Sequence, residues 1–404
     1  AQATAALANA YHLLFEYAGL PEAETLDPAM ELLEQALELN PELGEAYLVR
    51  AEIYRHREDF EASEADFLKA RDLLPGNATV YHWFSFLKSA QDRDDEHYAL
   101  LEKAHQLDPM SAVIHANWAM RPFHEGRDDE TLAELDRIKG LHPAYPFTYS
   151  MESWIYYNQG DPLKSLRAQL KILELDPAST RAGFQCFTYL NLNAREAARK
   201  CIEDFEGPRQ GRRLYAELEM RLLEGDADGV QALIAAAEQD ERNSGFVAYA
   251  SLVIGDTEKA RKLFAGWRPE LFDAETPIEL EPHPEDNDGM IELAYVMQKT
   301  GQEERADQIL LALLASFEGE PRNRGAHAIG FDDVTLYALL GRQEEALSAL
   351  EAVASLPYLS DWQELRYMPY YDTLRGDPRF DSALNRLSEA ADEARRQAEA
   401  DGLL

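Results

Sequence analysis

Five prolines recur at a constant spacing and constrain the architecture of this chain more than any other feature. They occupy positions 41, 75, 109, 143 and 177, so every interval is 34 residues. A fixed period of about 34 residues is the length of one helix–turn–helix unit. Proline disfavours helical backbone in the residue before it, so each of these prolines is expected to end a helix. The spacing therefore predicts a stacked array of antiparallel helix pairs.

Other residue types keep the same register. A leucine stands two positions before each proline, as Leu39 does before Pro41. Six positions after four of the five prolines comes a large residue with a ring, and ten positions after comes a small one, which lets a neighbouring helix approach closely. These pairs are Tyr47 with Ala51, Tyr81 with Ser85, His115 with Ala119, and Tyr149 with Ser153.

This combination of an aromatic, a small residue, an alanine in the second helix and a closing proline resembles the tetratricopeptide repeat (TPR) family. The resemblance implies an all-α fold, a right-handed superhelical solenoid of about ten antiparallel helix pairs. Ala8 and Tyr11 fit the same first-helix pattern, and the stretch from Leu20 to Asp27 predicts a turn lengthened by about nine residues. Because the chain opens inside a repeat, without Met or a signal-like stretch, we expect a fragment of a longer protein or a processed chain.

The strength of the repeat signal divides the chain into six expected segments. The region 268–288 carries four prolines among acidic residues, so it is expected to form a long loop. The segments are a first repeat with an extended turn (1–43), four regular repeats (44–179), degenerate helix pairs (180–267), an acidic proline-rich loop (268–288), two further pairs (289–356), and an aromatic linker with a capping helix that runs to about Arg396 (357–404).

The end of the chain has a resemblance of its own. A repeat built like 334–356, an aromatic stretch and the run LRGDPRF at 374–380 are similar to C-terminal repeat regions of bacterial CadC-like winged-helix regulators and class III adenylate cyclases. This resemblance implies a repeat region that follows an N-terminal effector domain. No effector signature occurs in the chain itself, because its glycines form neither a dinucleotide-binding nor a P-loop pattern.

In the TPR family, the first helix of each pair faces a concave groove. The resemblance therefore implies that first helices of the regular repeats line such a groove here, and that it is aromatic rather than basic. Pro122 is expected to disturb the helix that contributes to it near Phe123. The expected partner-binding residues are His82, Trp83, Phe86, Asn117, Met120, Phe123, His124, Phe147, Met151, Trp154, Tyr157 and Asn158, with Arg55 and Arg181 as the permanent cations.

An aromatic groove with two asparagines suits an extended or helical peptide with large apolar anchors, whose backbone the asparagine side chains would bond. Family members that bind chaperones clamp a terminal carboxylate with Lys, Arg and Asn, and two arginines alone do not predict that clamp. Two other interpretations compete with peptide binding. Aromatic residues at helical spacing often form core, and the 268–288 loop is a candidate to occupy the groove itself.

The net charge excludes one class of partner. Acidic residues number 75 against 39 basic ones, which gives a net charge of −36. Affinity for nucleic acid comes from basic contacts that release counterions, so we expect no nucleic-acid partner. No stretch of about 18 uncharged apolar residues occurs, so no membrane span is expected. We expect a cytoplasmic protein, or a periplasmic one if a transmembrane segment lies upstream.

The sequence gives little support for catalysis or metal binding. The histidines are scattered, and the one local cluster, around His283, lies in the expected acidic loop without the spacing of a helical metal motif. No Ser or Cys lies in a nucleophile elbow. Cys186 and Cys201 are expected on facing helices of one pair, either as two buried apolar residues or, in an oxidising compartment, as a disulfide.

These observations predict a noncatalytic protein–protein interaction module, without cofactor or metal, that binds a peptide or protein partner and belongs to a larger bacterial signalling protein. One alternative is a small-molecule sensor domain whose groove, covered by the 268–288 loop, encloses a ligand in a closed pocket. Another alternative is a structural spacer or dimerisation element, which leaves a homodimer open.

Overall fold

The computed structural model describes residues 1–18, 20–177, 183–205, 210–273, 276–278, 289–316, 331–356 and 358–404. All regular structure in these ranges is helical, and it forms ten consecutive antiparallel helix pairs of TPR type. The predicted fold class is therefore confirmed. The chain divides into two compact units, Ala1–Pro143 (unit 1) and Ala144–Leu404 (unit 2).

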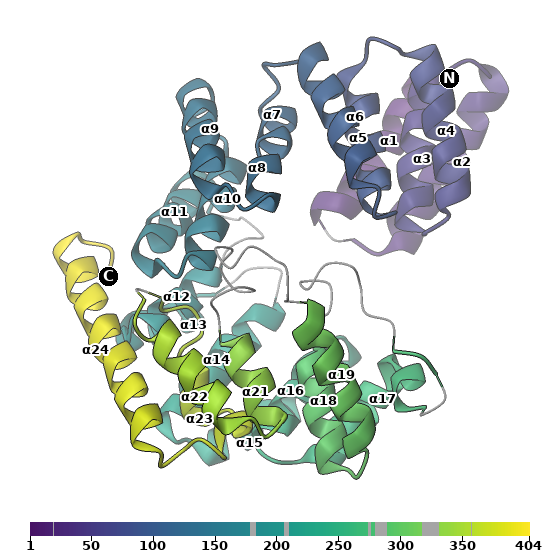
Figure 1. The fold of residues 1–404 in the computed structure, drawn as a ribbon. Coiled ribbons are helices and arrows are strands. Elements are labelled where there is room, and N and C mark those ends of the chain that lie inside the picture. The colour runs from purple at the N-terminus through teal and green to yellow at the C-terminus, as the bar shows by residue number, and fades with distance from the viewer. Residues whose placement is uncertain are drawn as a thin grey trace. The chain divides into compact units, whose positions relative to one another are not determined.

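Unit 1 holds four helix pairs (Figure 1). The first helix of its fourth pair is split in two, and Pro122 lies in the first turn of the second piece, where its missing N–H leaves no bond unmade. The helices are α1 (Gln2–Ala18) with α2 (Glu22–Leu39), α3 (Gly44–His56) with α4 (Phe60–Leu73), α5 (Ala78–Ser89) with α6 (Asp94–Leu107), and α7 (Ala112–Trp118) plus α8 (Arg121–His124) with α9 (Asp128–Leu141).

Unit 2 holds six pairs and a C-terminal segment. The pairs are α10 (Pro146–Asn158) with α11 (Pro162–Leu175), α12 (Phe184–Asn191) with α13 (Arg195–Glu203), α14 (Gln210–Glu224) with α15 (Ala227–Ala237), α16 (Ser244–Val253) with α17 (Thr257–Trp267), α18 (Met290–Lys299) with α19 (Glu303–Ser316), and α21 (Asp332–Leu339) with α22 (Gln343–Val353). The shorter elements and the last helix are η1 (Glu241–Asn243), η2 (Pro269–Phe272), α23 (Glu364–Tyr367), η4 (Pro369–Tyr371) and α24 (Pro378–Ala400). No helix among the described residues is long and apolar enough to cross a membrane.

The fixed distance between proline and tyrosine has a direct structural cause. The Tyr47 hydroxyl donates a hydrogen bond of 3.0 Å to the Pro41 carbonyl oxygen, and the Tyr81 hydroxyl donates to the Pro75 carbonyl oxygen, also at 3.0 Å. Each bond ties a first helix to the loop that precedes it. Tyr47 and Tyr81 therefore stabilise the fold.

The small residue ten positions after the proline lies where the two helices of a pair meet. The Ser63 hydroxyl donates to the Ala51 carbonyl oxygen at 2.8 Å, and the Ser165 hydroxyl donates to the Ser153 carbonyl oxygen at 3.1 Å. All four residues are buried. A larger side chain at position 51 or 153 would push the second helix away and break this bond.

The extended turn expected before Asp27 is not observed, because α2 already begins at Glu22. Pro28 lies inside this helix, where proline costs about 3 kcal/mol. Leu26 and Ala29 are completely buried and offset that cost by contact with the apolar core of the first pair. The repeat register, from which the extended turn was expected, carries no information on this burial.

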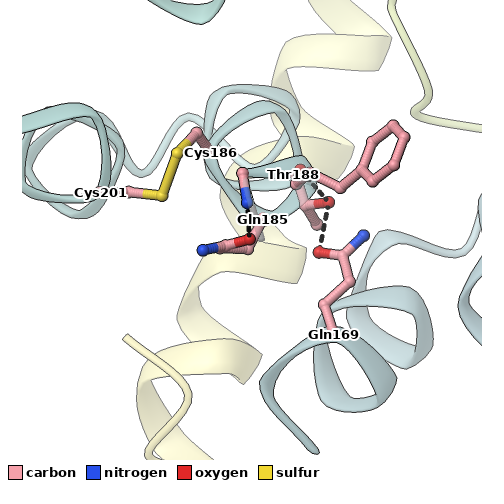
Figure 2. The surroundings of a disulfide bond; sticks show 7 residues. Gln169, Gln185, Cys186, Thr188 and Cys201 are labelled. Carbon is pink, nitrogen blue, oxygen red and sulfur yellow. Dashed lines mark hydrogen bonds between the residues drawn. A yellow bond between two sulfur atoms is a disulfide. The ribbon is translucent and has the colours of Figure 1, made fainter. Parts of the chain in front are cut away.

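Cys186 on α12 and Cys201 on α13 form a disulfide, with Cα atoms 5.5 Å apart (Figure 2). Of the two states left open by the sequence, the structure contains the disulfide. It closes a loop of 15 residues within one helix pair.

We expect the double substitution Cys186→Ala/Cys201→Ala to lower the free energy of unfolding by about 3 kcal/mol, because an open loop of this length gives the unfolded chain more conformational entropy. Guanidinium unfolding of the oxidised protein and the variant measures the difference. Two reactive thiols in the air-oxidised wild-type protein, or equal stabilities, would contradict this expectation.

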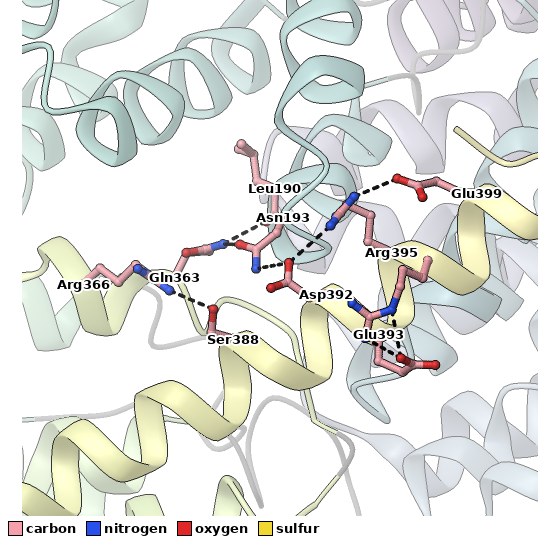
Figure 3. Close-up of polar contacts among 10 residues, drawn as sticks. Leu190, Asn193, Gln363, Arg366, Ser388, Asp392, Glu393, Arg395 and Glu399 are labelled. Carbon is pink, nitrogen blue, oxygen red and sulfur yellow. Dashed lines mark hydrogen bonds and ion pairs between the residues drawn. The ribbon is translucent and has the colours of Figure 1, made fainter.

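The C-terminal helix α24 contacts α22 of the last pair and also α11 of the first pair of unit 2. The Asn193 amide donates to Asp392 of α24 at 3.1 Å (Figure 3), and Arg167 pairs with Asp401 just beyond it. The helix continues past Arg396 to Ala400. It therefore does more than cap the last pair, since it links the two ends of unit 2.

Candidate functional site

The first helices of unit 1 form a continuous row, in which α1 contacts α3 and α3 contacts α5. We call the residues that these helices and α7 bring together the first-helix face of unit 1. It comprises His12, Phe15, Glu16, Glu52, Arg55, His56, His82, Trp83, Phe86 and Asn117.

Rings from three helices meet on this face. The ring of His12 lies 5.4 Å from that of Trp83 and 5.5 Å from that of His56, centroid to centroid, and Phe15 lies 5.1 Å from His56. Trp83 and His56 are half-buried, whereas His12 is buried. Of the predicted residues, Trp83 and Phe86 on α5 thus present partly exposed aromatic surface.

Arg55 is engaged by its own helix. Its guanidinium donates to Glu52 at 2.8 Å, and its Nη2 also lies 3.2 Å from Nε2 of His56. Burial raises the pKa of Glu52, and the Arg55 charge opposes that rise. An arginine neutralised in this way does not supply the free cation of a carboxylate clamp.

Asn117 and His82 bond each other across α7 and α5. The Asn117 amide nitrogen lies 3.0 Å from His82 Nε2 and donates to the Val113 carbonyl oxygen at 2.9 Å. Burial lowers the pKa of His82 to about 4, so the ring is neutral at pH 7 and Nε2 can accept a hydrogen bond. Both amide hydrogens of Asn117 are therefore hydrogen-bonded within unit 1. Its side-chain oxygen can accept a hydrogen bond from the N–H group of a partner.

The remaining predicted residues of unit 1 are dispersed. Met120 is half-buried at the break between α7 and α8, and Phe123 is buried. His124 is exposed on α8, and its Nδ1 lies 2.5 Å from the Tyr98 hydroxyl. Tyr98 belongs to α6, the second helix of the preceding pair. The structure thus does not bring His124 onto the first-helix face, consistent with the helix break at Pro122.

In unit 2, the predicted residues of α10 divide between core and contact. Met151 and Asn158 are buried, and Phe147 is half-buried beside Tyr145. The Tyr157 hydroxyl donates a hydrogen bond to Asp361, and Trp154, 45% exposed, stacks on Tyr157. Arg181 lies outside the described residues.

Asp361 belongs to the expected aromatic linker, residues 358–371, which packs along the first helices of unit 2. The Ser360 hydroxyl donates to the Tyr157 carbonyl oxygen of α10 at 2.8 Å. The Trp362 indole N–H donates to the Asn191 carbonyl oxygen of α12 at 2.9 Å, and α23 contacts α14. The linker expected from the sequence is thus a packed segment of unit 2.

The same segment continues over the remaining first helices. The Tyr249 hydroxyl of α16 donates to Glu364 at 3.2 Å. The Tyr370 ring lies 5.0 Å from that of Tyr295 on α18, and the Tyr371 hydroxyl lies 2.7 Å from the hydroxyl of Thr335 on α21. Segment 358–371 therefore contacts the first-helix side of all six pairs of unit 2, in the place where the family resemblance predicts a ligand.

The sequence makes the 268–288 loop a candidate to occupy the groove. The described part of this loop instead contacts α19, the second helix of its pair. Arg305 of α19 donates to the Leu271 carbonyl oxygen at 3.1 Å and to the Thr276 carbonyl oxygen at 2.7 Å. Residues 274–275 and 279–288 lie outside the described part of the chain. The segment that lies along the first helices of unit 2 is thus 358–371 and not the described part of 268–288.

Three carboxylic acids meet where segment 358–371 crosses α14 and α16. Burial, together with the charge of Asp361, raises the pKa of Glu219 to about 8. Burial likewise raises the pKa of Asp361, and burial with repulsion from Asp361 and Glu219 raises the pKa of Glu364 well above its usual value. Burial thus shifts the pKa of all three groups upward, toward the protonated form, in which a carboxyl group can donate a hydrogen bond.

Sequence reasoning missed His12, Glu16 and His56 on the face of unit 1. His56 falls in the same first-helix stripe as Arg55, and His12 and Glu16 are spaced i, i+4 on one helix. That spacing was the available signal. Their meeting with His56, from a helix about 40 residues later, depends on the stacking of α1 on α3.

No family model matches this chain. Two rice proteins (Oryza sativa subsp. japonica), DnaJ protein P58IPK homolog B and homolog A, are each 34% identical to it over 76 residues, or 19% of this chain and 16% of the relative. The match thus spans about one sixth of each relative's length.

Solved structures of low sequence identity are also similar. A structure of Pseudomonas aeruginosa pilF is 16% identical with a TM-score of 0.42, and covers 48% of this chain and 90% of its own. The P58(IPK) TPR domain is 15% identical with a TM-score of 0.24 and covers 95% of this chain and 98% of its own. A human IFIT1 dimer with m7Gppp-AAAA is 13% identical with a TM-score of 0.42, and covers 94% of this chain and 80% of its own.

Proposed function

We propose that the protein is a noncatalytic interaction module whose unit 1 binds an extended peptide of a partner protein on its first-helix face. The observation that carries this proposal is the contrast between the two units. In unit 2 segment 358–371 lies along the first helices, whereas the described residues of unit 1 form its four helix pairs and include no corresponding segment.

The side chains of unit 1 define the chemistry of the peptide. Trp83 and Phe86 offer partly exposed aromatic surface for a large apolar anchor, and the Asn117 side-chain oxygen can accept a backbone N–H. Arg55 is paired with Glu52, so a terminal carboxylate is not the expected anchor. The net charge of −36 also argues against RNA as the ligand.

Trp83→Ala tests this proposal. Peptides are first selected from a random displayed library on the full chain, and their affinity is then measured by fluorescence anisotropy. A central tryptophan is typically worth at least 2 kcal/mol, so we expect binding about 30-fold weaker in the variant.

Trp154→Ala is the matched control, because Trp154 is an exposed tryptophan of the predicted groove that belongs to unit 2. Binding that falls in the control and not in Trp83→Ala would assign the ligand to unit 2. Circular dichroism of both variants separates lost binding from lost folding.

The cellular setting is proposed as well. Disulfides persist in oxidising compartments, so the bond between Cys186 and Cys201 supports a periplasmic or extracellular location over the expected cytoplasmic one. The similarity of 334–380 to bacterial signalling proteins supports a role as the ligand-binding part of a larger signalling chain. Counting the reactive thiols of protein isolated from its native source tests the location. An oxidising compartment predicts no reactive thiol at Cys186 and Cys201.

A further inference from the structure

We infer that His12, Glu16 and His56 form a binding site for a divalent transition-metal ion of the zinc class. Each residue offers one ligand atom, and the three atoms lie within 4.8 Å of one another. Two imidazoles and one carboxylate are a ligand set that binds such ions in proteins. The inference is independent of peptide binding.

The separations of the ligand atoms are close to those of a metal site. Nε2 of His56 already lies 3.0 Å from Oε2 of Glu16. In a tetrahedral zinc site with bonds of about 2.0–2.1 Å, neighbouring ligand atoms are about 3.3 Å apart. His12 and Glu16 are one turn apart on α1 and therefore lie on the same face of the helix, with the third ligand atom within 4.8 Å of the other two.

His12 supplies an observation that the fold alone does not explain. It is only 2% exposed, and neither of its ring nitrogens has a hydrogen-bond partner among the described residues. A buried polar group without a partner costs about 1–3 kcal/mol. Coordination of a metal by one of these nitrogens would recover part of that cost.

The neighbouring charges permit a cation. Arg55 lies 3.2 Å from Nε2 of His56 and competes for that atom, but Glu52 holds the guanidinium at 2.8 Å and offsets its charge. A bound ion would replace the contact between Arg55 and His56.

Solvent reaches the proposed metal site from the side of Glu16. Glu16 is 41% exposed in its side chain, so its carboxylate reaches solvent, whereas His12 is buried. Three protein ligands leave a fourth position for water, as in zinc sites that are not fully closed by protein. Such an ion would also tie α1 to α3.

The test is a titration of the full chain with Co²⁺, followed by its visible absorption, and then displacement by Zn²⁺. We expect one equivalent to bind and Zn²⁺ to raise the thermal unfolding temperature. Glu16→Gln and His56→Gln should each weaken binding about tenfold or more. Glu16→Gln preserves the shape of a partly exposed side chain, so its effect does not depend on a buried substitution such as His12→Ala.

Two controls match these variants. Glu34→Gln removes an equal charge from an exposed position on α2, and His105→Gln removes a histidine of unit 1 that stacks on Trp118 away from this site. Both should bind Co²⁺ as the wild-type protein does. The inference is overturned if the wild-type chain binds no Co²⁺ or Zn²⁺ above background. It is also overturned if Glu16→Gln and His56→Gln bind as tightly as wild type, or if only His105→Gln abolishes binding.

Discussion

Trp362→Ala is expected to lower the free energy of unfolding by about 3–5 kcal/mol, the range for truncating a large buried aromatic. Trp362 is 0% exposed, and its indole N–H donates to the Asn191 carbonyl oxygen at 2.9 Å. The substitution creates a cavity and leaves that carbonyl oxygen without its donor. Denaturant unfolding of the full chain measures the change.

Hydrogen exchange then locates the damage. Exchange should accelerate in 358–371 and in α12, because Trp362 anchors the first to the second. Trp267→Ala is the matched control, since Trp267 is 43% exposed at the end of α17, and we expect it to cost much less. Equal costs for the two substitutions would show that segment 358–371 contributes little to the stability of unit 2.

Glu219→Gln is expected to stabilise the protein at about pH 8 and to have little effect at about pH 5. The folded-state pKa of Glu219 is raised to about 8 by burial and by Asp361. Its contribution to stability is therefore fully present below the unfolded-state pKa and is lost as the pH rises through about 8. Glutamine is uncharged at every pH, so the free energy of unfolding of the variant does not fall in this way.

A shift of one pKa unit corresponds to about 1.4 kcal/mol of stability. Because the Glu219 side chain is partly exposed, we expect Glu219→Gln to raise the free energy of unfolding at pH 8 by about 3 kcal/mol. Chemical unfolding at both pH values measures it. Glu203→Gln on α13 is the control, because it removes the same charge from an exposed position. A stabilisation that is equal at both pH values, or equal in the control, would rule out burial of Glu219 as the cause.

The helix pairs were predictable because the signals that specify them are local. The proline that ends a helix and the tyrosine that bonds the proline carbonyl oxygen are only six positions apart, as Pro41 and Tyr47 are. The turn expected at Leu20–Asp27 was wrong because it was inferred from the repeat register, whereas α2 begins at Glu22 and buries Leu26 in the core of the first pair.

The site was predicted less well because it depends on contacts between distant residues. The first-helix stripe contains Trp83 and Phe86, and the structure keeps both partly exposed. The stripe also contains Tyr157, whose partner Asp361 follows about 200 residues later. Repeat periodicity carries no information on such a partner, so a packed segment was expected to be a linker.

The central claim is that unit 1 binds ligand on its first-helix face while segment 358–371 keeps its place in unit 2. Hydrogen exchange of the full chain, with and without a peptide selected from the displayed library, tests it most directly. We predict slower exchange in α1, α3 and α5 on binding, and unchanged exchange in 358–371. Protection confined to unit 2, or faster exchange of 358–371 as the peptide displaces it, would contradict the claim.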